Sequence, residues 1–221
     1  MSLGQELLSD YAYEIDHNER RFKNMVNEGT NFTTGEVRMS FVHLTKPYAM
    51  QPGAPEKYSV TCLLPKTDVA TKQRMDAAIQ MAIQKGVQDK WNGVKPPNVK
   101  TPVWDGDGVK NDGTPFGPEC KGCWVFTAST FAESKPEIVD ASMNPIINGS
   151  DIYSGMYGHV NINAFPYANS GNRGIGFGLG PVQKTRDGEV LGGARVTAAA
   201  AFGAPAGQTV DPFTGKPLPF N

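Results

Sequence analysis

The sequence predicts a mainly β protein, a β-barrel with one inserted helix and long loops. Its 221 residues include 25 glycines and 17 prolines, a composition that favours many short strands and turns over a helical bundle. Several segments alternate apolar and polar residues with the two-residue period of strands, and only residues 68–86 have a clear helical period. A chain of this length buries one good core. We therefore expect a single domain at residues 35–202, with an N-terminal arm at 1–34 and a flexible tail at 203–221.

The first two strands are expected directly after the arm. Residues 36–44 alternate in character before Pro47, which we expect to end the strand. Residues 57–64 alternate as well, and we expect the two segments to pair. Their apolar faces are formed by Val37, Met39 and Phe41 in the first strand and by Tyr58, Val60, Cys62 and Leu64 in the second.

An amphipathic helix is expected next, at residues 68–86. Asp68 or Thr67 is the expected N-cap, and Gly86 is the expected C-terminal stop. The apolar stripe at helical spacing is formed by Met75, Ala78, Ile79, Ala82 and Ile83. Residues 87–121 are rich in Gly, Pro, Lys and Asp, so we expect them to leave the barrel as a long loop excursion.

Strand character returns at residues 122–129, and residues 152–167 form the longest predicted strand, with two faces of different chemistry. One face is apolar, with Ile152, Met156, Val160, Ile162 and Ala164. The other carries Tyr153, Tyr157, His159, Asn161, Asn163, Phe165 and Tyr167. Such rings form a platform for stacking flat groups, although tyrosines on sheets also pack against a second layer of the same domain. In the next strand, one face carries only Gly174, Gly176, Gly178 and Gly180, so a ring, a backbone or a ligand can approach it closely.

Charge and cysteine content narrow the class of protein. The chain has 21 Lys and Arg residues against 22 Asp and Glu, a net charge of −1, so it lacks the overall basic character typical of nucleic-acid binding. Its three cysteines cannot form an even disulfide framework. The sequence opens without the apolar core of a signal peptide and contains no apolar run of membrane-spanning length. We therefore expect a cytoplasmic protein that does not associate with membranes.

Two motifs have part of the ligand set of a metal site. Cys120 and Cys123 have the spacing of half a zinc knuckle, but a structural zinc needs four ligands and the chain has no second pair. Asp105, Asp107 and Asp112 bring three carboxylates close in sequence, without the glutamate that closes a calcium-binding loop. The three histidines belong to no nucleophile motif. We expect no metal, no cofactor and no catalytic residue, and hence a protein that is not an enzyme.

A series of short motifs follows one another between about residue 32 and residue 202. They are Gly35-Glu-Val-Arg-Met-Ser-Phe41, Lys57-Tyr-Ser-Val60, Leu64-Pro-Lys66, Trp91-Asn-Gly93, Asp105-Gly-Asp107, Ala128-Ser129, Pro136-Glu-Ile-Val-Asp140, Ile152-Tyr-Ser-Gly155, Gly174-Ile-Gly176, Asp187-Gly-Glu189 and Leu191-Gly-Gly193, with Phe202 nearby. In this order and spacing they resemble the single-stranded-DNA-binding proteins of tailed phages and prophages, a family typified by the Enc34 phage protein and formerly classed as a domain of unknown function.

This resemblance implies an OB-fold-like Greek-key barrel that binds single-stranded DNA with little sequence preference, in phage or prophage DNA replication or recombination. Bases are then expected to stack on rings and phosphates to meet cations. By their chemistry, the residues we expect to bind nucleic acid are Arg38, Lys57, Lys66, Trp91, Trp104, Tyr153, Tyr157, Phe165, Tyr167, Arg173 and Lys184.

Candidate further partners are a second copy of the chain, as in a dimer, and replication or recombination proteins of the bacterial host cytoplasm. Many single-strand binders recruit partners through an acidic C-terminal tip, whereas Asp211 is the only acidic residue of this tail. Two other functions stay open. A structural virion or assembly protein would use the aromatic strand as a subunit interface, and a metal-dependent nuclease would use Asp105, Asp107 and Asp112.

Overall fold

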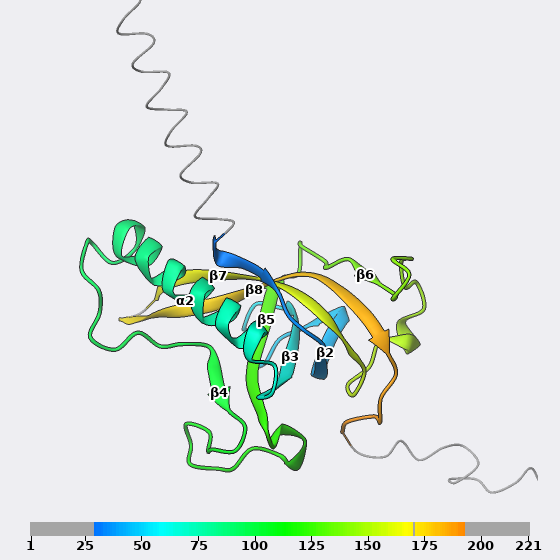
Figure 1. The fold of residues 1–221 in the computed structure, drawn as a ribbon. Helices are drawn as coiled ribbons and strands as arrows, with labels where there is room; N and C mark the ends of the chain where they lie inside the picture. Colours follow the sequence, from blue (N-terminus) through cyan, green and yellow to red (C-terminus); the bar gives the residue numbers. More distant parts are fainter. Residues whose placement is uncertain (1–28, 170, 193–221) are drawn as a thin grey trace, which may run out of the picture. The chain divides into compact units, whose positions relative to one another are not determined.

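The computed structural model describes residues 29–169 and 171–192, and Figure 1 shows how their elements are arranged. The strands are β1 (Asn31–Thr33), β2 (Val37–Tyr48), β3 (Lys57–Pro65), β4 (Val103–Asp105), β5 (Cys123–Phe131), β6 (Ile138–Val139), β7 (Tyr157–Asn169) and β8 (Asn172–Arg186). The helices are α2 (Val69–Asp89) and the short 3₁₀ helices η1 (Pro118–Cys120) and η2 (Gly149–Asp151). The tail expected at 203–221, and the expected arm up to residue 28, lie outside the described residues.

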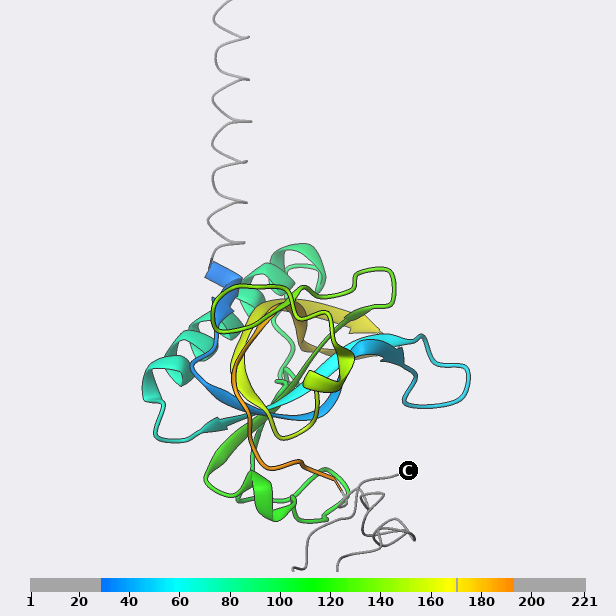
Figure 2. The same ribbon diagram turned by 90° about the vertical axis from the view of Figure 1, so that its right-hand side faces the viewer.

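Five of the strands close a barrel. Strand β2 pairs with β3, β3 with β5, β5 in parallel with β8, β8 with β7, and β7 returns to β2. Figure 2 views the resulting ring of strands approximately end on. In chain order this is a 1-2-3-5-4-1 barrel, the arrangement of a partly open five-stranded Greek-key barrel, so the predicted OB-like fold is confirmed.

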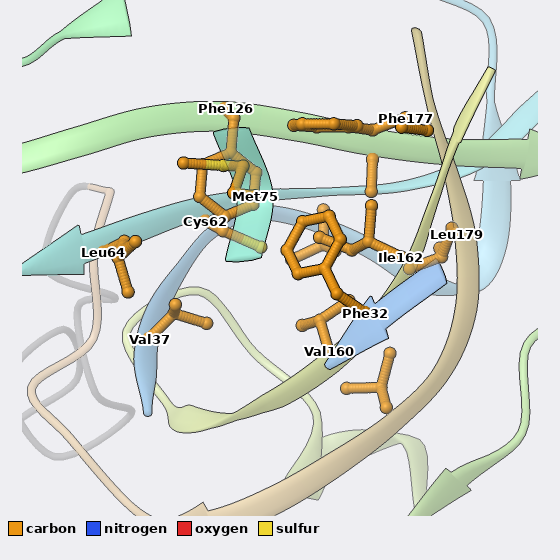
Figure 3. Packing of buried hydrophobic residues seen from close by; sticks show 14 of the residues in the cluster. Phe32, Val37, Cys62, Leu64, Met75, Phe126, Val160, Ile162, Phe177 and Leu179 are labelled. Atoms are coloured by element: carbon orange, nitrogen blue, oxygen red, sulfur yellow. The ribbon is translucent and has the colours of Figure 1, made fainter. Parts of the chain in front are cut away.

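The barrel interior takes one face of each strand (Figure 3). The predicted apolar faces of β3 and β7 are buried, as are Val37 and Met39 of β2. Phe177 of β8 lies at the centre, with its ring centroid 5.9 Å from that of Phe32 and 5.6 Å from that of Phe126, both edge to face. Strands from both ends of the described chain therefore share one core.

Phe41 does not join this core, contrary to the prediction. The pairing of β2 with β3 shifts register between Ser40 and His43, and Phe41 is 69% exposed with a φ of 45°. A bulge of this kind adds one residue to a strand and turns the following side chains to the other face. The strand also continues through Pro47. In the described part of the chain the other edge of β2 pairs with β7 only at Val37 and Arg38, so an amide donor is not needed at Pro47.

Helix α2 begins as predicted and ends later. The Asp68 side chain caps it by accepting a hydrogen bond from the Thr71 amide at 3.0 Å, and the predicted apolar stripe is buried. Gly86 is not the stop, because the helix continues to Asp89. A Cβ atom at Gly86 would lie 2.8 Å from both the Pro166 Cβ and the Trp91 ring, so the glycine is needed for close packing inside the helix.

Trp91 is fully buried, so the expectation that it is available for stacking is wrong. Its indole N–H donates to the Tyr167 carbonyl at 3.1 Å, and its ring packs beside Gly86. The excursion expected at residues 87–121 therefore starts with part of the core. It later returns as β4, which pairs with β5 through Trp104 and Val125.

Two predicted boundaries also move. Residues 31–33 form β1, which pairs with β7 and contributes Phe32 to the core, so the domain begins within the expected arm. The strand expected from residue 152 begins at Tyr157. Gly155 precedes it with a φ of 116°, where a Cβ would clash with the Glu189 carbonyl, so the chain bends there instead of extending.

Replacing Trp91 by Ala should reduce the free energy of unfolding by about 3–5 kcal/mol, since it empties a buried site and removes a hydrogen bond. Trp104→Ala is the matched control, because Trp104 is 37% exposed and should cost less than about 1 kcal/mol. Urea unfolding of the two variants compares them directly, and equal losses would contradict the placement of Trp91.

Candidate nucleic-acid interface

The ring row is defined as Tyr153, Tyr157, Phe165 and Tyr167. The last three lie on the outward face of β7, whereas Tyr153 precedes the strand and packs partly against the core. From Tyr157 to Tyr167 every second residue of β7 points into the core, so the predicted alternation holds in the strand itself. Phe165 is the most open of the four at 41% exposure, and the three tyrosines are half-buried.

Phe165 and Tyr167 lie against the glycines of β8. Phe165 pairs with Gly176 and Tyr167 with Gly174 across the hairpin. A Cβ at Gly176 would lie 2.7 Å from the Phe165 Cζ, and one at Gly174 would lie 2.8 Å from the Tyr167 Oη. The bare face of β8 therefore lets the protein's own rings lie close to the sheet. Phe165 still keeps much of its surface open to solvent.

Tyr153 and Tyr157 are occupied by charged groups of the same chain. The Arg186 guanidinium carbon lies 3.5 Å from the Tyr157 ring centroid, and the Arg38 guanidinium lies 5.8 Å away. The Tyr153 hydroxyl donates to the Asp187 carboxylate at 2.8 Å. A ring covered in this way offers less open face to a base than Phe165 does.

The five cations predicted to meet phosphates fall into two groups. Three are engaged within the chain: Lys66 with Asp105 and Asp107 at 2.6 Å each, Lys184 with Asp187 at 2.7 Å, and Arg38 with the Glu189 carbonyl at 2.9 Å. The other two, Lys57 and Arg173, form no ion pair with a carboxylate of the described residues. Lys57 lies over the Phe131 ring, 5.1 Å from its centroid.

A groove of about 620 Å³ crosses the outer face of β2, β3 and β5. Its floor is the outward face of these strands, with Thr61 and Thr127 hydrogen-bonded to each other at 2.9 Å. Two walls flank this face. One wall, next to β2, has Phe41 and Met50, and the other, next to β4, has Trp104, Lys110 and Phe116. Aromatic walls above a floor that combines Thr61 and Thr127 with the apolar Leu63 and Val125 can hold flat groups by stacking.

Each wall has a local cause in the sequence. The bulge in β2 turns Phe41 outward, and the loop after β2 carries Met50, which is 89% exposed. On the other side, β4 pairs with β5 and presents Trp104. The loop that follows folds back onto the sheet through a small second cluster of apolar residues, formed by Leu63, Cys120 and Val125 with Phe116, Cys123 and Leu191 against them.

Sequence reasoning missed Phe41, Lys110, Phe116 and Phe131 as candidate site residues. Alternation predicts Phe41 on the apolar face of its strand, because the bulge has no signal in the sequence pattern. Phe131 could have been found, since Val125, Thr127, Ser129 and Phe131 continue one period-two face beyond the predicted end of the strand at residue 129. Lys110 and Phe116 reach the groove only because the excursion folds back.

One row of small or polar residues joins the groove side of the barrel to the ring row. Across neighbouring strands the paired positions are Ser59, Ser129, Gly178, Asn163 and Asn31. None of these side chains is large, so the surface between the groove and Phe165 is low. An extended ligand can therefore cross from β3 to β7 without meeting a bulky side chain.

The candidate metal residues do not form one cluster. Asp112 accepts hydrogen bonds from the amide and hydroxyl of Thr114 in its own turn, whereas Asp105 and Asp107 bind Lys66. These contacts hold the pKa of all three carboxyls below the usual range. Within residues 29–169 and 171–192, no group of three or more His, Cys, Asp or Glu side chains is placed to hold a metal ion.

Burial also acts on the two thiols of the half-knuckle motif. It raises the pKa of the Cys120 thiol to about 11 and also raises that of Cys123. Both thiols are therefore protonated at neutral pH, which disfavours metal ligation and nucleophilic reaction.

Comparison with known proteins identifies the family. The sequence matches the family model described as Enterobacter phage Enc34, ssDNA-binding protein, over residues 30–212. The chain belongs to this family.

Among curated proteins, none is significantly similar in sequence. No helix in the described part of the chain is long and apolar enough to cross a membrane.

Solved structures of phage single-stranded DNA-binding proteins resemble the fold. The single-stranded DNA-binding protein from bacteriophage Enc34 in complex with ssDNA matches with a TM-score of 0.63 and 28% identity, over 74% of this chain and 90% of that chain. A second structure of the Enc34 protein matches with a TM-score of 0.60 and 28% identity, over 78% and 90%. The bacteriophage T7 protein gp2.5 matches with a TM-score of 0.53 and 18% identity, over 82% and 98%, a likeness of fold alone.

Replacing Glu36 by Gln tests how Arg186 is held on Tyr157. The hydrogen bonds from Arg186 and then from Thr185 keep the pKa of the Glu36 carboxyl below its usual range. The carboxylate therefore stabilises the fold above its unfolded-state pKa of about 4.3, and this contribution is lost as pH falls through the lower folded-state pKa. In urea unfolding between pH 7 and pH 3, the variant should be less stable at neutral pH, and the difference should vanish in acid. A difference that grows in acid would contradict the contact.

Proposed function

We propose that the protein binds single-stranded DNA, with little preference for sequence, along the outer face of its barrel. The observation that carries this proposal is the aromatic groove over β2, β3 and β5. OB folds bind oligonucleotides across the face of their second and third strands and through the loops between strands 1 and 2 and between strands 4 and 5. In this chain the corresponding parts are β3, β5, residues 49–56 and the β7–β8 hairpin. The Enc34 relative, whose structure includes ssDNA, supports the same function.

Stacking supplies sequence-tolerant affinity, because every base has a flat face. In the groove the rings available to bases are Phe41 and Trp104, 69% and 37% exposed. On the hairpin, Phe165 is the corresponding open ring. Of the predicted stacking residues, we therefore retain Trp104 and Phe165 as primary contacts and assign Tyr153, Tyr157 and Tyr167 to the margin of the DNA path.

Phosphates are expected to meet the cations that form no ion pair with a carboxylate of the described residues. Lys57 beside Phe131, Lys110 beside Phe116 and Arg173 on the hairpin have this property. With a net charge of −1, the chain attracts DNA through such local cations and not through its overall charge. Binding should consequently weaken as salt rises.

We infer a non-enzymatic role in phage or prophage DNA replication or recombination in the cytoplasm of the bacterial host. The nuclease alternative has little support, because Asp105 and Asp107 bind Lys66 whereas Asp112 binds Thr114, and the three form no metal-binding group in the described part of the chain. The assembly alternative uses the ring row as a subunit interface, yet Tyr153 and Tyr157 are already in contact with charges of their own chain.

Fluorescence anisotropy of a labelled oligonucleotide tests the function directly. The purified protein should bind single strands at low salt, more tightly than duplex of the same sequence, and mixed sequences should bind with similar affinity. Failure to bind single strands at low salt would show that the proposed function is wrong.

Phe41→Ala and Trp104→Ala should each weaken single-strand binding by about 1–3 kcal/mol, or roughly fivefold to 150-fold, because each removes a stacking ring. Phe165→Ala should have an effect of the same sign on longer oligonucleotides. Ile147→Ala is the control, since Ile147 is 94% exposed and lies outside the groove. Equal affinities for the three ring variants and the control would remove the groove and hairpin from the DNA path.

A further inference from the structure

We infer that Lys66 is a positioning residue for the groove, which holds the Trp104 wall in place without contacting DNA phosphate. This inference rests on the proposed function and assigns a different role to a lysine whose type alone predicts a phosphate contact.

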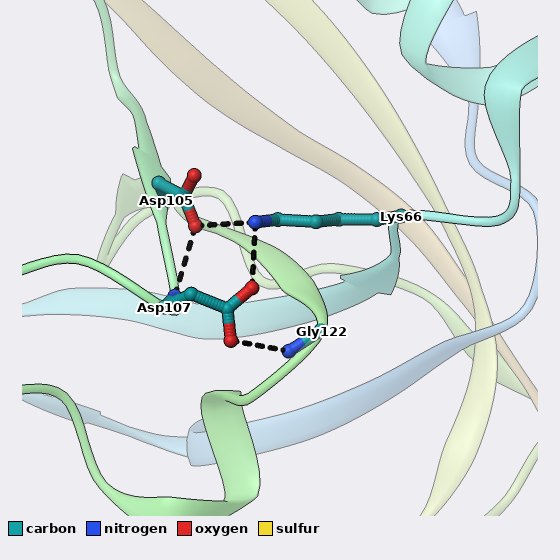
Figure 4. A network of polar contacts seen from close by, with 4 residues as sticks. All are labelled: Lys66, Asp105, Asp107 and Gly122. Carbon is teal, nitrogen blue, oxygen red and sulfur yellow. Dashed lines mark hydrogen bonds and ion pairs between the residues drawn. The ribbon is translucent and has the colours of Figure 1, made fainter.

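The side chain of Lys66 joins two residues next to the wall. Its Nζ lies 2.6 Å from the Asp105 Oδ1 and 2.6 Å from the Asp107 Oδ2 (Figure 4). Asp105 is the last residue of β4 and follows Trp104 directly. The ammonium group therefore binds the residue adjacent to the ring that lines the groove.

Backbone contacts extend this pairing into a closed network. The Asp107 amide donates to the Asp105 Oδ1 at 2.9 Å, and the Gly122 amide donates to the Asp107 Oδ1 at 2.9 Å. The Lys66 amide in turn donates to the Gly122 carbonyl at 2.8 Å. Lys66 thus connects the end of β3, the end of β4 and the residue before β5 through both its side chain and its backbone.

The network fixes both ends of the loop that completes the wall. This loop leaves β4 at Gly106 and returns at Gly122, and its residues Lys110 and Phe116 line the groove together with Trp104. Loss of the Lys66 side chain removes its contacts with Asp105 and Asp107 at the start of the loop. The backbone bonds from Gly106 to Cys123 and from Lys66 to Gly122 remain. The wall then keeps its pairing with β5 but loses two of the contacts that hold Trp104 and the start of the loop in position relative to Phe41.

The charges at this site disfavour a phosphate contact. One ammonium group faces two carboxylates, so the cluster of Lys66, Asp105 and Asp107 has a local net negative charge. A DNA phosphate would have to displace a carboxylate and then lie beside it. A positioning role and a phosphate role therefore predict different salt dependences.

Lys72 supplies a matched control. Both lysines lie over the Trp124 ring, whose centroid is 5.0 Å from the Lys66 Nζ and 4.8 Å from the Lys72 Nζ. Lys72 pairs with Asp76 on α2 at 2.6 Å and, among the described residues, forms no ion pair with β4 or its loop. Lys66→Met and Lys72→Met thus each remove one positive charge next to the same ring, and only the first opens the network.

Anisotropy titrations of single-stranded DNA over a range of salt should separate the roles. Lys66→Met should weaken binding by roughly threefold to tenfold at every salt concentration, with an unchanged slope of log K against log salt. Lys57→Met, which removes a proposed phosphate contact, should reduce that slope by about 0.7. Lys72→Met should match the wild type. Lys66→Arg keeps the positive charge and can donate to both Asp105 and Asp107, so it should retain most of the wild-type affinity.

For Asp107→Asn, the charge effect and the network effect predict opposite changes in DNA affinity. Removal of a negative charge raises affinity for DNA on general electrostatic grounds, whereas disruption of the network lowers it. We expect weaker binding, with a thermal midpoint close to that of the wild type. Tighter binding by Asp107→Asn, or a reduced salt slope for Lys66→Met, would overturn the positioning role. If the wild type binds and both variants behave like Lys72→Met, this inference alone fails; if the wild type does not bind, the proposed function fails.

Discussion

The closure of the barrel through β8 is the constraint on which the rest of the structure depends. This strand pairs in parallel with β5 at Ser129 and Gly178, and antiparallel with β7 along almost its whole length. Each strand has two faces, so once the ring is closed one face must fill the interior and the other must face outward. The interior takes Phe177 and its neighbours. Every candidate contact with DNA is a consequence of which residues remain outside.

The outer surface is low in the middle and raised at its sides. Glycines on β8 and small polar residues on β3 and β5 keep the middle flat, which lets Phe165 lie against the sheet. The raised parts come from irregular features, the bulge that exposes Phe41 and the excursion that carries Trp104. A regular barrel of the same strands would have neither wall, so the groove depends on departures from regular strand geometry. The Lys66 network stabilises the excursion that carries Trp104.

Local patterns in the sequence predict the regular parts of this fold. They fail where a contact with a residue remote in sequence determines whether a side chain is buried, paired or exposed. Alternation identifies β3 and β7 correctly, and the capping residue and apolar stripe identify α2, because these signals act within a few residues. Gly86 is typical of a helix end, but the close approach of Pro166 and Trp91 makes it a packing residue. Trp91 and Lys66 are residue types common in nucleic-acid binding sites. Trp91 is nevertheless buried against β7, and Lys66 is paired with Asp105 of β4, and both partners are remote in sequence. The family resemblance identified the fold and the general function, while the choice of rings and cations from chemistry alone could not separate open side chains from engaged ones.

Backbone amide shifts in ¹⁵N-labelled protein, recorded while a short single-stranded oligonucleotide is added, test the central claim most directly. The largest changes should follow the outer face of β3 and β5, include Phe41 and Trp104, and continue to Phe165 on the β7–β8 hairpin. Changes confined to another surface, such as residues 140–151 with the adjoining part of β8, would contradict the account even if DNA binds.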